Sequence, residues 1–299
     1  MQIFIAVLIL CLSLSGCGSS GNSSAEPPSY SPLKVLIPES PGKKTIGYSP
    51  LILDISNIDQ GYLTARSEAE DQKMNVQLTA EDGVIYSYFI NPGENAVIPF
   101  TNGSGTYQVC CYQQVSNSQY AALFADTLNV KLDNEFLPFL YPNQYVNFSP
   151  DSQASKLALS IVPEDTSDVN ALQALYDYVV KNVSYDYDLA ENVDAGYLPD
   201  VDRTLKTGKG ICFDYASLMT AMLRSRDIPC KLQIGYAGSI KHAWIDVYIR
   251  SRGWVDKAIE FSGESWSRLD PTFDSNSEDK GTVQEYIKDS DNYTVQFTR

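Results

Sequence analysis

The chain has 299 residues, of which 43% are hydrophobic, so it can bury a substantial core in one large or two medium-sized domains. Acidic residues outnumber basic ones by 37 to 22, and the formal net charge is −15 at pH 7. A field of this sign repels nucleic acid and anionic lipid headgroups, which argues against nucleic-acid partners. We therefore expect a two-domain protein that acts on something other than nucleic acid.

The N-terminal segment is apolar and short. The run Ile3–Leu14 is only about half the roughly 20 residues needed to span a bilayer, so it is typical of a signal peptide, predicted over residues 1–16. Leu14-Ser15-Gly16-Cys17 follows, and it resembles the lipobox of bacterial lipoproteins. The resemblance implies that Cys17 is lipidated and anchors an extracytoplasmic protein to a bacterial membrane. Because no Lys or Arg precedes the apolar run, an ordinary signal peptide with a chance cysteine is the alternative.

A polar stretch follows Cys17. It is rich in Gly, Ser and Asn and then in Pro through Pro41, and such a composition buries too little apolar area to fold. We predict a flexible tether over residues 17–44.

Residues 45–133 are predicted to form a β-sandwich. Short β-like runs alternate with turn residues such as Asn91-Pro92-Gly93, and Gly61-Tyr62-Leu63 is a candidate for a further strand. Cys110 and Cys111 are adjacent on one run, so their side chains should point to opposite faces as small buried hydrophobes. The six runs are Leu51–Ile55, Met74–Leu78, Val84–Ile90, Ala96–Phe100, Thr106–Tyr112 and Thr127–Leu132.

The tract 134–159 contains Pro138, Pro142 and Pro150 and follows neither strand nor helix period, so we predict a linker between two domains. A second domain is expected over residues 160–299. It begins with a helix that Ser167 and Asp168 can cap. Apolar residues then repeat at helical spacing through about Asn182, namely Leu172, Leu175, Tyr176, Val179 and Val180.

Cys212 is the candidate nucleophile. Glycines precede it in Gly208-Lys209-Gly210, and an amphipathic run follows it, so the cysteine should open a helix. The free backbone N–H groups and the positive end of the helix dipole favour a thiolate there, and the same N–H groups could hold an oxyanion. On its own, a glycine-flanked cysteine is more often structural.

His242 is the only histidine in the sequence, and it stands at the start of the β-like run His242–Ile249. Placed 30 residues after Cys212, on a strand rather than in the same helix, it can deprotonate the thiol or form an imidazolium–thiolate pair with it. A third group must then orient the imidazole, and Asp270, at the end of another β-like run, is the candidate. Asp246, about 13 Å from His242 along the strand, and Asp256 are weaker rivals.

Three ordered stretches resemble the transglutaminase-like superfamily, a papain-related group of thiol enzymes. They are Gly210-Ile211-Cys212 with Asp214-Tyr215-Ala216 and the stretch from Arg224 to Pro229, then Gly235-Tyr236 to His242-Ala243-Trp244, and then Asp270-Pro271-Thr272. The resemblance implies an α+β papain-like domain over residues 160–299 with a Cys212–His242–Asp270 triad. It also implies an oxyanion role for an aromatic or polar residue upstream of the nucleophile, for which Tyr197 is the candidate.

The resemblance implies an extracytoplasmic thiol enzyme that acts on amide bonds of a protein or peptide, with cell-wall peptide as one candidate. Hydrolysis by a peptidase or amidase is favoured. The alternatives are amine transfer by a transglutaminase and a non-catalytic cell-surface binding scaffold. No cofactor is expected, and one histidine with scattered cysteines offers no zinc or calcium site. Cys230 is expected to be buried and inert.

Overall fold

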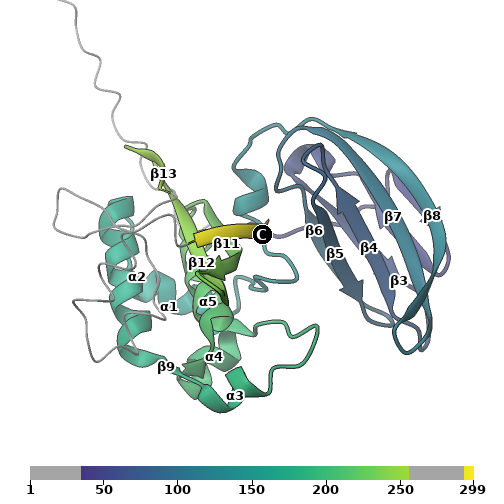
Figure 1. The fold of residues 1–299 in the computed structure, drawn as a ribbon. Helices are drawn as coiled ribbons and strands as arrows, with labels where there is room; N and C mark the ends of the chain where they lie inside the picture. Colours follow the sequence, from purple (N-terminus) through teal and green to yellow (C-terminus); the bar gives the residue numbers. More distant parts are fainter. Residues whose placement is uncertain (1–34, 256–292) are drawn as a thin grey trace, which may run out of the picture.

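The computed structural model describes residues 35–255 and 293–299, which form a sheet-rich N-terminal region and a C-terminal region of helices, a four-stranded sheet and a two-stranded sheet (Figure 1). The predicted signal peptide, lipidated Cys17, tether residues 17–34, Asp256 and Asp270 lie outside the described residues. Within them, no helix is both long and apolar enough to cross a membrane.

The N-terminal region contains two four-stranded antiparallel sheets. The first has the order β1-β2-β3-β6, with β1 at Thr45–Tyr48, β2 at Leu51–Asp54, β3 at Tyr62–Ser67 and β6 at Asn95–Pro99. The second has the order β5-β4-β7-β8, with β4 at Met74–Thr79, β5 at Ile85–Ile90, β7 at Gly105–Ser116 and β8 at Gln119–Val130. The short 3-10 helix η1 (Ile58–Gln60) precedes β3.

Side chains from both sheets contribute to one hydrophobic cluster, for example Leu53 and Leu63 from the first sheet and Val76 and Tyr88 from the second. Alternation along the strands produces this burial, because every second side chain points to the same face. The prediction of a sheet-rich N-terminal region is confirmed, and the finer prediction of a β-sandwich stays a prediction. Cys111 is buried but Cys110 is only half-buried, so the expectation of two buried cysteines is confirmed for Cys111 and wrong for Cys110.

Residues 35–44 were predicted to be tether, but they lie against the first sheet. The backbone N–H of Gly42 donates to Oδ2 of Asp54 (2.5 Å), and the N–H of Glu39 donates to the hydroxyl of Tyr62 (2.8 Å). Val35 is buried in the core of the C-terminal region. This stretch is ordered despite its polar composition, because side chains of the first sheet accept hydrogen bonds from its backbone N–H groups.

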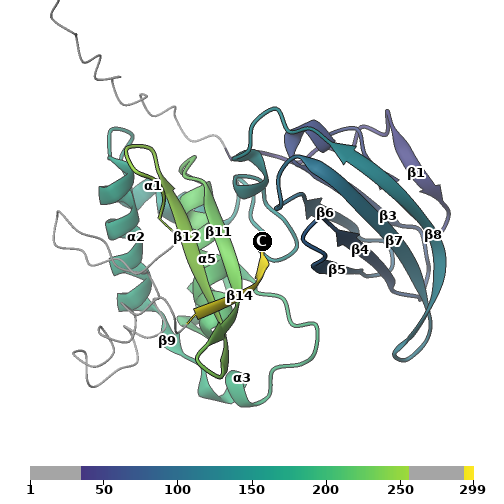
Figure 2. The same cartoon turned by 45° about the horizontal axis from the view of Figure 1, so that its top comes forward.

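The C-terminal region is built around a central helix. Its four-stranded sheet has the order β13-β12-β11-β14, and α5 packs against β11 and β12 (Figure 2). The helices are α1 (Gln153–Ile161), α2 (Asp168–Asn182), α3 (Tyr187–Glu191), α4 (Val201–Thr207) and α5 (Cys212–Arg224). The strands are β9 (Ser184–Tyr185), β10 (Lys209–Gly210), β11 (Cys230–Ala237), β12 (Ile240–Ile249), β13 (Gly253–Val255) and β14 (Tyr293–Thr298).

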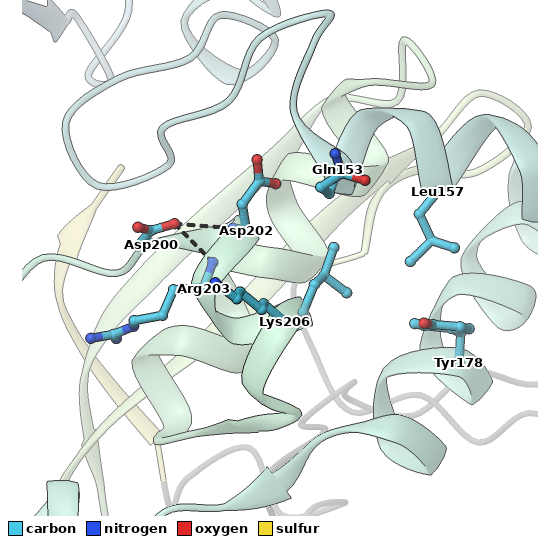
Figure 3. Close-up of a pocket in the computed structure, with 8 residues that line it drawn as sticks. Gln153, Leu157, Tyr178, Asp200, Asp202, Arg203 and Lys206 are labelled. Atoms are coloured by element: carbon cyan, nitrogen blue, oxygen red, sulfur yellow. Dashed lines mark hydrogen bonds between the residues drawn. The ribbon is translucent and has the colours of Figure 1, made fainter.

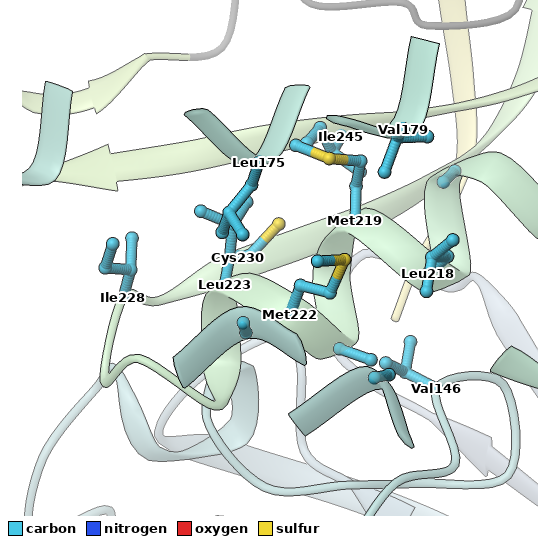
Figure 4. Packing of buried hydrophobic residues seen from close by; sticks show 14 of the residues in the cluster. Val146, Leu175, Val179, Leu218, Met219, Met222, Leu223, Ile228, Cys230 and Ile245 are labelled. Atoms are coloured by element: carbon cyan, nitrogen blue, oxygen red, sulfur yellow. The ribbon is translucent and has the colours of Figure 1, made fainter. Parts of the chain in front are cut away.

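Helix α5 is the core of this region, because all its residues from Asp214 to Arg224 are buried. Leu218, Met219 and Met222 pack against α1, α2 and the sheet, as Figure 4 shows for a part of the cluster. The predicted helix after Ser167 is confirmed as α2, and the Ser167 side chain accepts the N–H of Asn170 at its start. A helix that is buried along almost its whole length has little freedom to shift. Its packing therefore fixes the position of Cys212 at the start of α5.

The tract 134–159, predicted as a linker, is packed between the two regions and contains the 3-10 helix η2 (Leu137–Phe139) and most of α1. The hydroxyl of Tyr145 donates to the carbonyl of Ser87 in β5 (3.0 Å). Buried Arg299, which follows β14, makes a second connection between the regions. Its Nη1 donates to the hydroxyl of Tyr88 in β5 (2.9 Å), and its guanidinium lies over the rings of Tyr88 and Tyr145. The two regions are therefore joined by specific contacts.

Candidate active site

Cys212 is the first residue of α5, as the glycine-flanked motif predicts. The chain reaches it through Gly208, whose left-handed backbone (φ 62°) ends α4, and through β10, which pairs in parallel with β9. Gly210 must lack a side chain, because a Cβ there would lie 2.6 Å from Cβ of Asp214. The thiol is half-buried at a helix start, where unpaired N–H groups favour an anion. Reagents can reach it there.

His242 lies on β12 and is only 6% exposed. Its ring is stacked with Trp244 (centroids 6.4 Å apart) and tilted against Tyr293 at the same separation. Its cross-strand neighbour is Gly235, where a Cβ would collide with the carbonyl of Thr294 in β14. The absence of a side chain at Gly235 therefore lets β14 pack close to β11 at the position that pairs with His242.

Cys212 and His242 stand on elements that are in contact, because α5 packs against both β11 and β12. Strand β11 follows α5 after a short turn, packs against it and so runs back along it. From Arg224 back to Cys212 the helix rises about 18 Å, and from Cys230 to Gly235 the strand advances about 17 Å. Arg224 Nε is hydrogen-bonded to the carbonyl of Cys230 (3.0 Å), which aligns the two starting points. These lengths bring Gly235, and with it the backbone of His242, toward the Cys212 end of α5. The ring of His242, however, lies with Trp244 and Tyr293, on the face of the sheet opposite Ala243 and Ile245, which pack in the α5 cluster.

Of the candidates for the third member of the triad, only Asp246 is described. It is buried, and its Oδ2 accepts a hydrogen bond from Nε2 of Gln233 on β11 (2.5 Å). Gln233 in turn accepts from the hydroxyl of Thr298 on β14 (2.8 Å). Asp246 thus has a role in joining three neighbouring strands of the sheet, and Asp270 stays a prediction.

Tyr197 is held by two charged residues near the start of α5. Its hydroxyl donates to Oδ1 of Asp214 (2.7 Å), and Arg203 on α4 donates to the same hydroxyl and to Oδ1 of Asp214 (3.3 Å). Oδ2 of Asp214 accepts the N–H of Ile211 (2.9 Å), the residue before Cys212. The hydroxyl proton of Tyr197 is thus directed at Asp214. The oxyanion role of Tyr197 stays a prediction.

Sequence reasoning did not find the roles of Asp214 and Arg203. The signal for Asp214 was present, because an acidic residue at the third position of a helix is the usual partner of the N-cap backbone. Arg203 gave no such signal, since nothing in the sequence brings α4 beside the first turn of α5. Cys230 is fully buried, and burial raises the pKa of its thiol to about 12. The prediction of a buried, inert cysteine is confirmed in its structural part.

A hollow of about 680 Å³ lies between α1, α2 and α4, and Arg203 is one of the residues that line it (Figure 3). Asp200 caps α4 there, with its Oδ1 accepting the N–H groups of Asp202 and Arg203. Among the described residues, neither Cys212 nor His242 lines the hollow, so the hollow is separate from the thiol. The lining residues are Gln153, Leu157, Tyr178, Asp200, Asp202, Arg203, Leu205 and Lys206.

Comparison with known proteins places this site in a family. Residues 155–258 match the model of the transglutaminase-like superfamily. The uncharacterised protein YebA of Bacillus subtilis is 28% identical over 153 residues, which are 42% of this chain and 20% of that protein. The kyphoscoliosis peptidase of Mus musculus is 26% identical over 113 residues, which are 34% of this chain and 17% of that protein.

Among solved structures, a transglutaminase from red sea bream is similar over 73% of this chain and 49% of that one, with 11% identity and a TM-score of 0.33. The matched stretch spans a fifth or less of the length of these two curated relatives. The matched residues include both Cys212 and His242. The chain contains a transglutaminase-like core domain.

Proposed function

We propose that this protein is an extracytoplasmic thiol enzyme that hydrolyses amide bonds in a protein or peptide. The observation that carries the proposal is the placement of Cys212. It is a half-buried thiol at the start of the buried helix α5, and the only histidine of the sequence stands on β12, a strand of the sheet that packs against α5. A thiol and a base on neighbouring elements of one domain are the two parts that nucleophilic acyl transfer requires.

The proposed reaction has two steps. The sulfur of Cys212 attacks the amide carbonyl, a C–S bond forms, the C–N bond breaks, and His242 passes the thiol proton to the leaving amine. Water then attacks the thioester, His242 takes a proton from the water, and the released thiol recovers one. Asp270 would orient the imidazole. The free N–H groups at the start of α5 would stabilise the oxyanion of both steps.

Hydrolysis and transfer differ only in the second nucleophile, which is water or an amine. Hydrolysis is our choice because the mouse relative that shares this domain is named a peptidase. The extracytoplasmic location and the lipid anchor at Cys17 belong to the same proposal, and they rest on the apolar run and the lipobox-like sequence. The net charge of −15 is consistent with a protein or peptide partner.

The test uses the full chain, a mixed peptide library read by mass spectrometry, and a fluorescent primary amine as an alternative acceptor. We expect cleaved peptides from the wild type, none from Cys212→Ala, and unchanged cleavage by Cys110→Ala as the matched cysteine control. Amine incorporation without cleavage would replace hydrolysis by transfer. If Cys212→Ala retains every activity and binding property of the wild type, the enzyme proposal is wrong and the scaffold alternative replaces it.

A further inference from the structure

The first turn of α5 contains a fully buried carboxylate close to the candidate nucleophile. Asp214 is 0% exposed and follows Cys212 by two residues. Its Oδ2 accepts the N–H of Ile211 (2.9 Å), so the carboxylate closes the turn in which Cys212 lies. A buried negative charge is costly unless it is paired, and beside a thiol it would oppose formation of the thiolate.

The other oxygen of the same carboxylate is paired with two side chains from outside the helix. Oδ1 of Asp214 accepts from the hydroxyl of Tyr197 (2.7 Å) and from Nη2 of Arg203 (3.3 Å). The guanidinium of Arg203 also lies 5.3 Å from the ring centre of Tyr197. Burial and the hydrogen bond to Asp214 raise the pKa of Tyr197, so the phenol stays a proton donor over the physiological range. We call Tyr197, Arg203 and Asp214 the clamp.

Arg203 is itself held in place. Its backbone N–H donates to Oδ1 of Asp200 (3.0 Å), which caps α4, and α4 ends at Gly208, two residues before the Gly210 that touches Asp214. Helix α4 therefore positions the guanidinium of Arg203. Its C-terminal end also leads into the segment that reaches Cys212. Arg203 also lines the hollow between α1, α2 and α4, so its other face is open to solvent.

We propose that Arg203 and Tyr197 are positioning residues that neutralise Asp214 and hold the first turn of α5, so that the helix start favours the thiolate of Cys212. The inference rests on the proposed function. With the clamp closed, the carboxylate fixes the backbone before the nucleophile while Arg203 cancels its charge. Without Arg203 the same carboxylate repels the thiolate. In this role the Tyr197 hydroxyl serves Asp214 and not an oxyanion.

The other titratable groups around this turn are named so that their effects can be separated. Tyr185 on β9 lies close enough to Cys212 to interact with its charge, and burial together with that charge raises the pKa of Tyr185, so it stays neutral below its own range. His242 on β12 is present in every variant compared. Differences between variants at Arg203 therefore report the clamp.

The experiment measures the rate of Cys212 alkylation by iodoacetamide against pH in the full chain, with mass mapping of the labelled site. Arg203→Met should raise the midpoint by about 0.5 pH unit, which is about a threefold slower reaction at pH 6. Arg203→Lys should recover more than half of the shift, because it restores the charge. Lys206→Met, the same charge change one turn further along α4, is the matched control and should leave the midpoint within about 0.1 pH unit of wild type.

Tyr197→Phe keeps the ring and removes the hydroxyl, so it should shift the midpoint in the same direction by less. It also keeps the proposal testable if Arg203→Met does not fold. A wild-type midpoint well below that of a free thiol, unchanged in both Arg203→Met and Tyr197→Phe, would overturn the clamp and leave the proposed function intact. A wild-type midpoint near about 8.5 would overturn the proposed function, whatever the variants do. Equal shifts from Arg203→Met and Lys206→Met would show a general charge effect and would also overturn the clamp.

Discussion

The two ends of α5 each combine a cysteine with an arginine, in opposite surroundings. At the start of the helix, Cys212 is half-buried and the half-exposed Arg203 is paired with the carboxylate of Asp214. At the other end, Cys230 and Arg224 are both buried, and among the residues that the structure describes Arg224 donates to the backbone carbonyls of Tyr141, Cys230 and Arg299. The same two residue types therefore stand in a partly exposed site at one end and in the buried core at the other.

The difference shows that a nearby guanidinium does not by itself make a thiol reactive. Arg224 lowers the pKa of Cys230, but burial raises it far more, and the net result is a pKa of about 12. Removing a thiolate from water costs more than one neighbouring charge returns. At the start of the helix the thiol keeps access to solvent, so local charges and backbone N–H groups can decide its state. Exposure is therefore the first difference between the two thiols.

The largest expected effect comes from the arginine at the buried end. Arg224→Met should lower the free energy of unfolding by about 3 kcal/mol, because three carbonyls lose a charged donor in the core. Arg203→Met should cost only about 1 kcal/mol, since the guanidinium is partly exposed and the buried carboxylate of Asp214 keeps the Tyr197 hydroxyl and the Ile211 N–H as partners. Urea unfolding followed by tryptophan fluorescence measures both. Equal losses would contradict the contrast between the two ends.

The two thiols should differ in labelling by about 100-fold or more. At pH 7, iodoacetamide should modify Cys212 in the folded protein and leave Cys230 unmodified, because the buried thiol is both protonated and out of reach. Peptide mapping after a short exposure gives the ratio. In urea the two should become similar, which is the internal control. Comparable labelling of both in the folded protein would break the distinction.

Cys230 should also make the protein less stable at alkaline pH. Its pKa is raised on folding to about 12, so the stability that it contributes is complete below the pKa of the unfolded thiol and is lost as the pH rises toward 12. Between pH 8 and pH 10 the wild type should lose about 2 kcal/mol more than Cys230→Ala, because only the unfolded chain releases this proton. Parallel urea titrations at the two pH values measure the difference, and identical losses would contradict it.

Much of the fold was predictable because alternation is a local signal. Met74–Leu78 predicted β4 (Met74–Thr79), since its buried positions recur along a paired strand. The exposed strand β1 was missed, because Thr45–Tyr48 is short and buries nothing on its own. The first half of β8 was missed for a related reason, since it lies on the surface and has no apolar alternation. Strands held mainly by their neighbours leave little trace in the sequence.

The site was predictable in part. The helix start at Cys212 and the strand of His242 follow from glycine placement and β-propensity, and both are confirmed. The clamp was not predictable, because Tyr197 and Arg203 meet Asp214 only after α4 has packed beside α5. The packing of the predicted linker was also not predictable, because its prolines conceal contacts made with both regions. Tertiary contacts of this kind override local composition.

The most direct test of the account is the pH dependence of Cys212 alkylation in the wild type and in His242→Ala. If the thiol and the imidazole form a functional pair, the wild type reacts rapidly at pH 6 and His242→Ala reacts about tenfold more slowly, with its midpoint moved toward that of a free thiol. Lys241→Ala, the neighbouring position on β12, is the control and should behave like the wild type. If His242→Ala and the wild type react alike at every pH, the thiol is not activated by this histidine and the proposed chemistry is wrong.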